Sequence, residues 1–141
     1  MIERCLGKYV FFSQQKSEQV PVFSLRSKKS AGVGDFGDLK TMIDLVASTG
    51  QKVLQLLPIN DTTITHTWTD SYPYSCISVF AIHPMYVDLH ALPELKDAKA
   101  RAAAEKKREQ LNSLSQIDYE QVNDFKIKLL APDIRTGRQK G

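Results

Sequence analysis

The sequence has little of what marks secreted, membrane-spanning or nucleic-acid-binding proteins. Its two cysteines, Cys5 and Cys76, lie far apart without a second pair, which favours free thiols over a disulfide. The longest apolar stretch near its start, YVFF at 9–12, is far shorter than the ~20 residues of a membrane-spanning helix. The net charge of +3 is too small to indicate a nucleic-acid partner, which calls for a concentrated basic face.

Targeting and cofactor motifs are also missing. The first residues, MIERCLGK, mix charges of both signs and lack the apolar core of a signal peptide, so we expect a cytoplasmic protein without membrane association. His66, His83 and His90 do not have HExxH or comparable spacing, and no G-x-S-x-G motif occurs. The sequence therefore predicts no metal and no cofactor. We expect a structural role for His83, beside Pro84, whereas His66 could contact a ligand hydroxyl.

A strand–helix–strand pattern opens the recognisable part of the chain. VPVFSL at 20–25 and KVLQLL at 52–57 are typical of strands, the second covered on both faces. Asp35 or Asp38 is suited to cap the helix between them, and Gly50 to close it. The apolar residues of this helix recur at i, i+3, i+4 and i+7, as Leu39, Met42, Ile43 and Val46.

This order predicts a βαβ unit, and therefore an α/β fold with parallel strands and a right-handed crossover. The loops that follow the two strands, 26–37 and 58–77, should then lie side by side at the carboxyl edge of the sheet. Open α/β sheets and (β/α)8 barrels both build their ligand sites at that edge.

The rest of the chain is more helical. Residues 78–89 indicate a short helix or turn that runs into an extended piece, and the composition of 98–114 strongly favours a solvated outer helix. A further helix is expected over 119–130, where Pro132 should stop it. The residues after it, DIRTGRQKG, are typical of a basic, disordered tail.

The loop 58–77 is unusually long and contains aromatic residues. A pyranose ring presents C–H groups on its face and hydroxyls around its rim, so an aromatic platform beside short polar side chains suits it. The alternative is that Tyr72 and Tyr74 only anchor the loop to the core. The loop supplies such a mixture in Asn60, Asp61, Trp68, Asp70, Ser71 and Tyr74.

Two further motifs carry alternative chemistries. Asp61 and Asp70 could form a glycosidase-like carboxylate pair, but loop carboxylates more often accept backbone N–H groups in Asx turns. GVGDFG at 32–37 has the G-x-G-x-x-G spacing of a dinucleotide-binding loop. Its loop is longer than the tight turn of that motif, however, and the second strand ends LLPIN without the expected acidic residue. A nucleotide site is therefore disfavoured.

Several of these segments together resemble a known family. PVFSLRS, GVGDFGDL, QLLPIND, DSYPYS and SVFAIHPMYVDL occur in the order and spacing of the 4-α-glucanotransferases, also called amylomaltases or disproportionating enzymes. The resemblance covers about residues 20–92, and 93–123 fit more loosely. It implies a partial (β/α)8 TIM barrel consisting of the first βαβ unit plus additional helices. It also implies transfer of α-1,4-glucan segments between maltodextrins or to glucose, with retention through a covalent glucosyl-enzyme.

The resemblance assigns roles to residues of the long loop. Tyr74 matches the family tyrosine that lies against the sugar at the cleavage subsite, and Asn60, Asp70 and Ser71 would shape that pocket. Trp68 is the further aromatic candidate for the bound α-1,4-glucan or maltodextrin. The catalytic carboxylates of the family lie on later strands, beyond residue 141, so we expect no catalytic residue in this chain and little activity from it alone.

The family pattern divides the chain into an atypical segment 1–19, the N-terminal portion of the barrel at 20–123, and a divergent helix with a basic tail at 124–141. A truncated coding region is the simplest expectation. A non-catalytic glucan-binding or complementing module, or an inert truncated product, is the alternative. The open edge of so small a sheet also favours self-association or dependence on a partner fragment.

Overall fold

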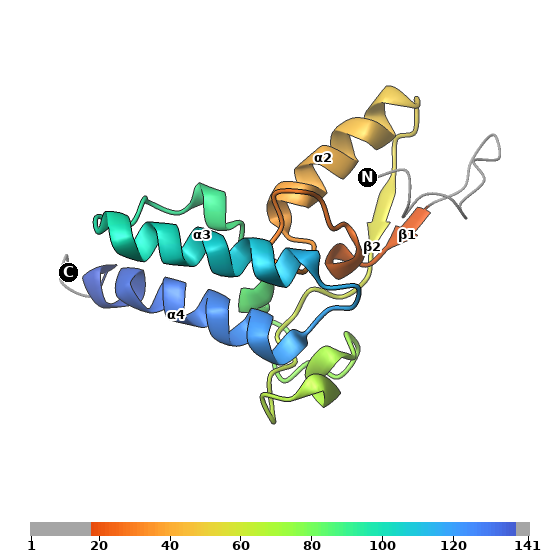
Figure 1. Ribbon diagram of the computed structural model, residues 1–141. Coiled ribbons are helices and arrows are strands. Elements are labelled where there is room, and N and C mark those ends of the chain that lie inside the picture. The colour runs from red at the N-terminus through yellow and green to blue at the C-terminus, as the bar shows by residue number, and fades with distance from the viewer. Residues whose placement is uncertain (1–17, 138–141) are drawn as a thin grey trace.

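The computed structural model describes residues 18–137 and shows a mixed α/β arrangement (Figure 1). Two short parallel strands lie beside helix α2, and two long helices form a hairpin next to them. The strands are β1 (Glu18–Val20) and β2 (Leu54–Leu56); the helices are α2 (Phe36–Ser48), α3 (Ala98–Ser113) and α4 (Tyr119–Gly137); and the 3-10 turns are η1 (Val22–Ser24), η2 (Trp68–Ser71), η3 (Pro84–Tyr86) and η4 (Leu89–Ala91).

The expected parallel pairing is confirmed, but the first strand lies earlier than predicted. Glu18 pairs with Leu54 and Val20 with Leu56, so β1 ends where we expected it to begin. Pro21 has no backbone N–H to give to a strand, and its carbonyl instead accepts the backbone N–H and the hydroxyl of Ser24. The predicted strand residues 22–24 therefore form η1.

Strand β2 is not covered on both faces, contrary to the prediction. Leu54 and Leu56 are half-buried, whereas Val53 and Gln55 are exposed. This alternation is what a strand shows when only one of its faces is covered. The run KVLQLL predicts burial on both faces because it has few polar residues. In the described part of the chain the sheet has two strands, and helix α2 lies beside it and can cover only one face.

Helix α2 has the predicted caps at both ends. The Asp35 carboxylate accepts from the backbone N–H groups of Gly37 and Asp38, and the Asp38 carboxylate accepts from the Asp35 N–H, which completes a capping box. Gly50, just beyond the last turn, has a φ of 78°. A residue with a side chain is strained in that left-handed conformation, so glycine suits this position.

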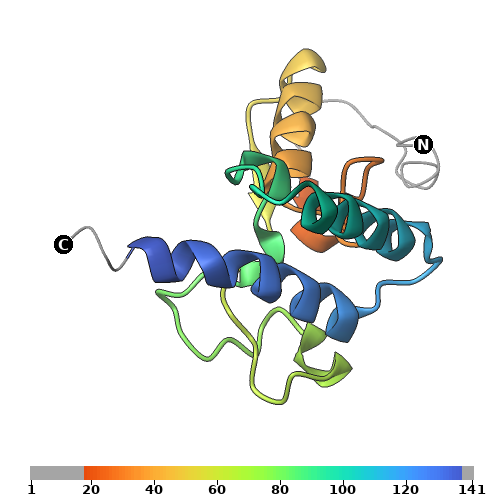
Figure 2. The same ribbon diagram turned by 60° about the vertical axis from the view of Figure 1, so that its left-hand side comes forward.

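Helices α3 and α4 lie side by side in both views and pack against the loop 26–37 (Figures 1 and 2). The Arg26 guanidinium donates to the carbonyls of Asn112 and Leu114 at the end of α3. Arg108 of α3 donates in return to the carbonyls of Lys28 and Ser30. One arginine from the loop and one from α3 therefore hold this helix against the loop.

Helix α4 does not stop at Pro132, as we had expected, but continues to Gly137. A proline within a helix removes one backbone N–H donor, and the bonds before and after it can remain in place. The predicted tail at 133–141 is thus helical as far as Gly137, and its last four residues lie outside the described part of the chain.

The segment after the long loop is extended first and turns afterwards, the reverse of the predicted order. Ile82 forms an antiparallel bridge with Asn60, and η3 and η4 follow it. The His83 ring accepts the backbone N–H of Met85, and Pro84 occupies the first position of the turn, so this local sequence starts a turn at 83 rather than a strand.

The hydrophobic core lies where the two strands end and is closed by the α3–α4 hairpin. Phe36 and Leu39 of α2 and Leu56 and Ile59 around the end of β2 pack against it. The core therefore forms between both loops of the βαβ unit, the 83–87 segment and the hairpin. Its buried members are Val22, Val33, Met85, Tyr86, Leu111 and Val122.

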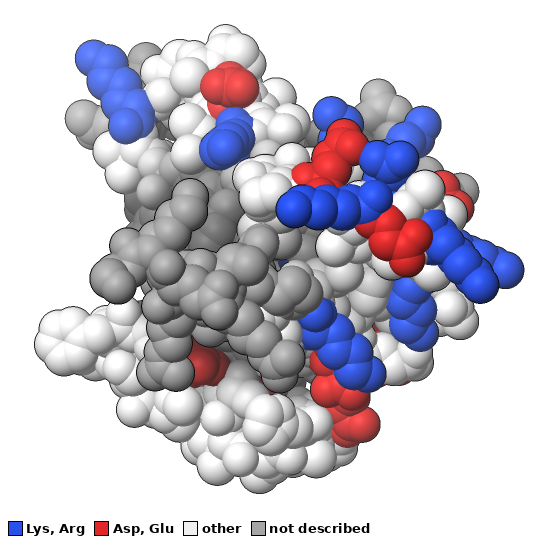
Figure 3. Space-filling model, turned by 90° about the vertical axis from the view of Figure 1, so that its left-hand side faces the viewer, with Lys and Arg blue, Asp and Glu red and all other residues white. Residues whose placement is uncertain are grey.

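The surface carries mixed charges on one face and exposed apolar side chains along the segment that follows the long loop. Acidic and basic side chains alternate on the face shown in Figure 3, as expected from the sequence of α3. Ile77, Val79, Phe80 and Ile82 are all exposed along the segment that follows the long loop. Over residues 18–137, no helix combines the length and the apolar character needed to span a membrane.

Candidate functional site: the aromatic loop and its pocket

The base of the loop 58–77 is held by a short antiparallel ladder. Asp61 exchanges backbone hydrogen bonds with Ala81 and Ile77, each 2.9 Å long. The Asn60 amide donates to the Val79 carbonyl at 3.0 Å. The structure thus assigns Asn60 a role at the base of the loop, where it holds the two segments together.

Asp70 organises the tip of the loop. Its carboxylate accepts the backbone N–H groups of Ile64, Thr65 and His66 and the Thr65 hydroxyl, at 2.7–3.2 Å. His66 has a φ of 59°, and this tight turn brings the three N–H groups round one carboxylate. Slight desolvation raises the pKa of Asp70, but the hydrogen bonds from Thr65 and its neighbours outweigh it. The pKa of Asp70 is therefore lower than its ordinary value.

Asp61 also accepts a local backbone donor, the Thr63 N–H at 2.9 Å. Both carboxylates therefore act as turn acceptors, which is the alternative that we favoured over a catalytic pair. Thr62, buried beneath them, donates its hydroxyl to the Asp70 carbonyl. The tip and the base of the loop are in this way tied to each other without a ligand.

We expect the loop tip to lose order in acid. The pKa of Asp70 is lower in the folded loop than its ordinary value of 3.8, so ionised Asp70 stabilises the turn above that value, and this contribution is lost as the pH falls through the lowered folded pKa. In an NMR titration, the amide signals of Thr65 and His66 should shift together below about pH 4. An Asp70→Asn variant should lack this step, and an unchanged titration in the variant would contradict the assignment.

Tyr72 and Tyr74 form an exposed aromatic pair. Their ring centroids are 5.5 Å apart with an interplanar angle of 49°, and Tyr74 is 57% exposed. Neither ring is part of the buried core, so the alternative that they only anchor the loop finds no support in the packing. Ser71 lies half-buried beside them at the end of η2.

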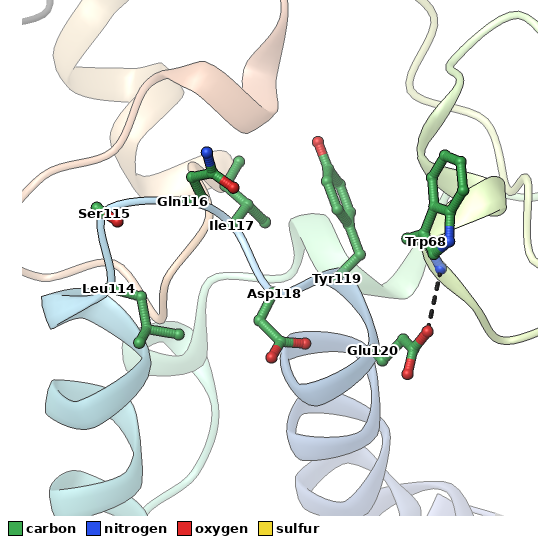
Figure 4. A pocket seen from close by; sticks show the side chains of 8 residues that line it. All are labelled: Trp68, Leu114, Ser115, Gln116, Ile117, Asp118, Tyr119 and Glu120. Atoms are coloured by element: carbon green, nitrogen blue, oxygen red, sulfur yellow. Dashed lines mark hydrogen bonds between the residues drawn. The ribbon is translucent and has the colours of Figure 1, made fainter.

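Trp68, by contrast, lines a pocket formed with the turn between α3 and α4 (Figure 4). The pocket is open and has a volume of about 480 Å³. Trp68 is 71% exposed, and its indole and the Tyr119 ring point in the same direction in Figure 4. The lining residues are Trp68, Leu114, Ser115, Gln116, Ile117, Asp118, Tyr119 and Glu120.

Carboxylates lie along one side of this pocket. Glu120 accepts the backbone N–H of Trp68 at 3.3 Å, which joins the loop to the start of α4. Hydrogen bonds from the backbone and side chain of Gln121 lower the pKa of Asp118, so this carboxylate remains an acceptor. The pocket combines two aromatic side chains with two acidic ones, a combination that suits the C–H faces and hydroxyl groups of a sugar.

Sequence reasoning identified Trp68 but missed the opposite wall. Tyr119 was placed only at the start of a helix, although Asp118 and Glu120 flank it with the same aromatic-and-acidic mixture that distinguished the long loop. Burial raises the pKa of Tyr119, and burial together with Tyr119 raises the pKa of Tyr86 to about 12. Tyr119 packs against the core and also lines the pocket.

Two of the three glycine N–H groups in the loop at 32–37 donate within the chain and are not free for a ligand. The Gly34 N–H donates to the Phe23 carbonyl and the Gly37 N–H to the Asp35 carboxylate. The start of α2, where a phosphate would bind, already holds that carboxylate. Among residues 18–137, no group of three or more His, Cys, Asp or Glu side chains is arranged to hold a metal ion.

Two polar side chains, His83 and Lys126, are buried in the structure, and only His83 was expected to be structural. His83 is buried, and its ring accepts the Met85 N–H at 3.2 Å. Both observations support the structural role that we expected for it. Burial lowers the pKa of His83, and Asp61 and Asp70 oppose that effect. Lys126 of α4 is fully buried with the acceptors Asp35, Met85 and Val87. Nothing in the sequence FKIKLL separates this lysine from an exposed one.

The fold and the pocket describe a mixed α/β protein with an open pocket of aromatic and acidic side chains, and comparison with known proteins makes the class more specific. A sequence model of the 4-alpha-glucanotransferase family matches residues 20–140. A 4-alpha-glucanotransferase of Oryza sativa subsp. japonica is 44% identical over 101 residues, which are 72% of this chain and 11% of that protein. The 4-alpha-glucanotransferase of Chlamydia trachomatis is 38% identical over 121 residues, 86% of this chain and 22% of that protein.

The chain therefore belongs to the 4-alpha-glucanotransferase family, and the resemblance drawn from its motifs is confirmed. It spans less than a quarter of the length of these relatives. The activity of the whole proteins is accordingly a matter of proposal for this chain.

Proposed function

We propose that this chain supplies part of the glucan-binding site of a 4-alpha-glucanotransferase, which transfers α-1,4-glucan segments between maltodextrins or to glucose. One observation carries the proposal: in a member of this family, Trp68 and Tyr119 line an open pocket beside Asp118 and Glu120. The exposed Tyr72–Tyr74 pair on the same loop adds a second aromatic surface.

In this proposal β1, α2 and β2 are the first βαβ unit of a (β/α)8 barrel. Their parallel pairing supports it, as does the position of the long loop directly after β2. The relatives are several times longer than this chain, which leaves room for the remaining strands in a protein of the family type.

Each candidate residue has a defined part in glucan binding. Trp68 and Tyr74 offer flat faces to the C–H groups of glucose units, with Ser71 beside them. Asp70 acts indirectly, because its carboxylate is already engaged in holding the loop tip, and Asn60 holds the loop base. These engagements support a binding role and leave bond cleavage to residues elsewhere in a complete enzyme.

We expect the isolated chain to show no transfer activity. Incubation with maltotriose should yield neither glucose nor longer maltodextrins, because Asp61 and Asp70 are turn acceptors rather than a free acid and nucleophile. Time-resolved product formation that disappears in an Asp70→Asn variant would contradict this assignment.

Replacing either aromatic platform should weaken glucan binding. Trp68→Ala and Tyr74→Ala are each expected to raise the Kd of maltoheptaose about tenfold, or roughly 1.4 kcal/mol, as truncation of a central aromatic contact typically does. Isothermal titration calorimetry on the full chain measures this change directly.

Phe80→Ala provides the matched control. Phe80 is 94% exposed but does not line the pocket, so its loss should leave the Kd unchanged. Equal weakening by all three variants would indicate nonspecific contact with exposed rings.

A complementing module is our second candidate. The exposed apolar segment around Phe80 favours it, because such a segment can be covered by another part of a complete enzyme. Recovery of transfer activity when the remaining part of a relative is added would support it.

A further inference from the structure

Lys126 is an unusual residue for the middle of a surface helix. Its side chain is 0% exposed, and its ammonium group donates to the carbonyls of Met85 at 2.7 Å and Val87 at 2.8 Å. The third acceptor, the Asp35 carboxylate, lies at 3.4 Å. Lysine is almost never fully buried unless it is paired, and here each of its three donors has an acceptor.

The charges around this ammonium group make a stabilising role alone a weak explanation. Burial lowers the pKa of Lys126, and Asp35, Asp38 and Asp88 oppose that shift. Burial likewise raises the pKa of Asp35 against the attraction of Lys126. Replacing a buried ion pair by apolar residues is often neutral for stability, so this pair suggests a requirement for defined geometry.

The two carbonyl acceptors belong to the segment that supports the aromatic loop. The backbone N–H of His83 donates to the Ile59 carbonyl at 3.0 Å, and its ring lies 3.4 Å from the Thr63 hydroxyl. The same ring accepts the Met85 N–H. Contacts therefore run from Lys126 through the 83–87 segment to the loop that carries Trp68.

The opposite wall of the pocket is on the same helix as Lys126. Tyr119 and Glu120 form the start of α4, and α4 lies between α3 and the long loop (Figure 2). Lys126 thus joins the helix that carries one wall to the 83–87 segment, which supports the loop that carries the other.

We propose that Lys126 is a positioning residue of the glucan pocket, which sets the distance between Trp68 and the Tyr119 wall by fixing α4 to the carbonyls of Met85 and Val87. The inference deepens the proposed function and depends on it only for the identity of the ligand. Lys126 does not itself contact the glucan.

The test separates positioning from stability with a single and a double variant of the full chain, of which only the double variant keeps the net charge. Lys126→Met alone leaves the Asp35 carboxylate buried without its cation and should be strongly destabilised. Lys126→Met combined with Asp35→Asn removes the buried cation together with the carboxylate that it contacts. Asp38 keeps its hydrogen bond from the Ser30 hydroxyl, and asparagine remains a good cap for α2. This double variant should regain most of the stability in urea unfolding, but not the carbonyl contacts.

Trp68 is the single tryptophan of the chain, so 5-fluorotryptophan labelling gives one ¹⁹F signal that reports on the pocket. In the double variant we expect this signal to broaden at least twofold or to move toward its position in the unfolded chain. The Kd of maltoheptaose should rise about tenfold. Lys128→Met, the same change at an exposed lysine of α4, should leave the signal and the Kd as in the parent.

A double variant that is folded, with the parental ¹⁹F signal, would overturn the inference and leave Lys126 a purely structural residue. A double variant that cannot fold, while Lys128→Met does, would also overturn it, because stability rather than position would then be its role. If the parent does not bind maltoheptaose, the proposed function fails, whereas the ¹⁹F comparison still tests positioning because it needs no ligand.

Discussion

Replacing Gly34 with alanine will destabilise the protein by about 3 kcal/mol, the upper end of the usual cost of overpacking, because the atoms that the new methyl group meets are backbone atoms. A Cβ at this position would lie 2.1 Å from the Val22 carbonyl oxygen and 2.7 Å from the Leu25 nitrogen. Both are backbone atoms, and the Leu25 N–H already donates a hydrogen bond of 3.0 Å to the Val22 carbonyl. Any shift that admits the methyl group therefore breaks η1 or the Gly34–Phe23 hydrogen bond.

Urea unfolding followed by circular dichroism measures this loss. Gly50→Ala is the matched control, because a Cβ there has no atom within 4 Å and only the φ of 78° opposes it. That strain costs about 1–2 kcal/mol. If Gly34→Ala costs no more than Gly50→Ala, the close approach of η1 to the loop does not exist in solution.

Gly34 also shows why one motif in the sequence was hard to interpret. The spacing of Gly32, Gly34 and Gly37 is the same whether glycine is needed for a phosphate or for packing. Here Gly32 lies against Leu111 and Val122, and Gly37 lies against the Asp88 carboxylate. The partners that decide between these readings come from distant parts of the chain.

Features that depend on neighbours in sequence were predictable. Helix α2 was expected from its apolar spacing, and its caps from Asp35 and Gly50, because each of these acts within one or two turns of the chain. The parallel pairing followed from the order of elements. The errors at Pro21 and Pro132 arose where local rules allow two outcomes: a proline can precede a turn instead of a strand, and it can be tolerated within a helix.

The site was predictable only on one side for the same reason. Trp68 is recognisable in an aromatic loop, but the residue that accepts its N–H, Glu120, is 52 positions away. Lys126 and Asp35 are separated by 91 positions, and each has the sequence context of an ordinary surface or capping residue. Such pairs depend on how α4 packs, which composition and periodicity do not specify.

Leu111→Ala should produce the second large loss, about 3 kcal/mol, in the usual range for removing a buried leucine side chain. Leu111 is 1% exposed and is the single buried residue of α3. The rest of that helix is polar, so it has little else to hold it against the loop 26–37. The amides of 98–113 should lose protection from hydrogen exchange first, because α3 then depends on the contacts of Arg26 and Arg108.

Leu114→Ala is the matched control at the end of the same helix. Leu114 is 36% exposed and outside the core, so its truncation should cost less than about 1 kcal/mol and leave the exchange of α3 unchanged. Urea unfolding and hydrogen exchange of both variants distinguish the two positions. Equal effects would mean that α3 is held by its polar contacts, and that the wall of the pocket at 114–120 does not rest on the core through Leu111.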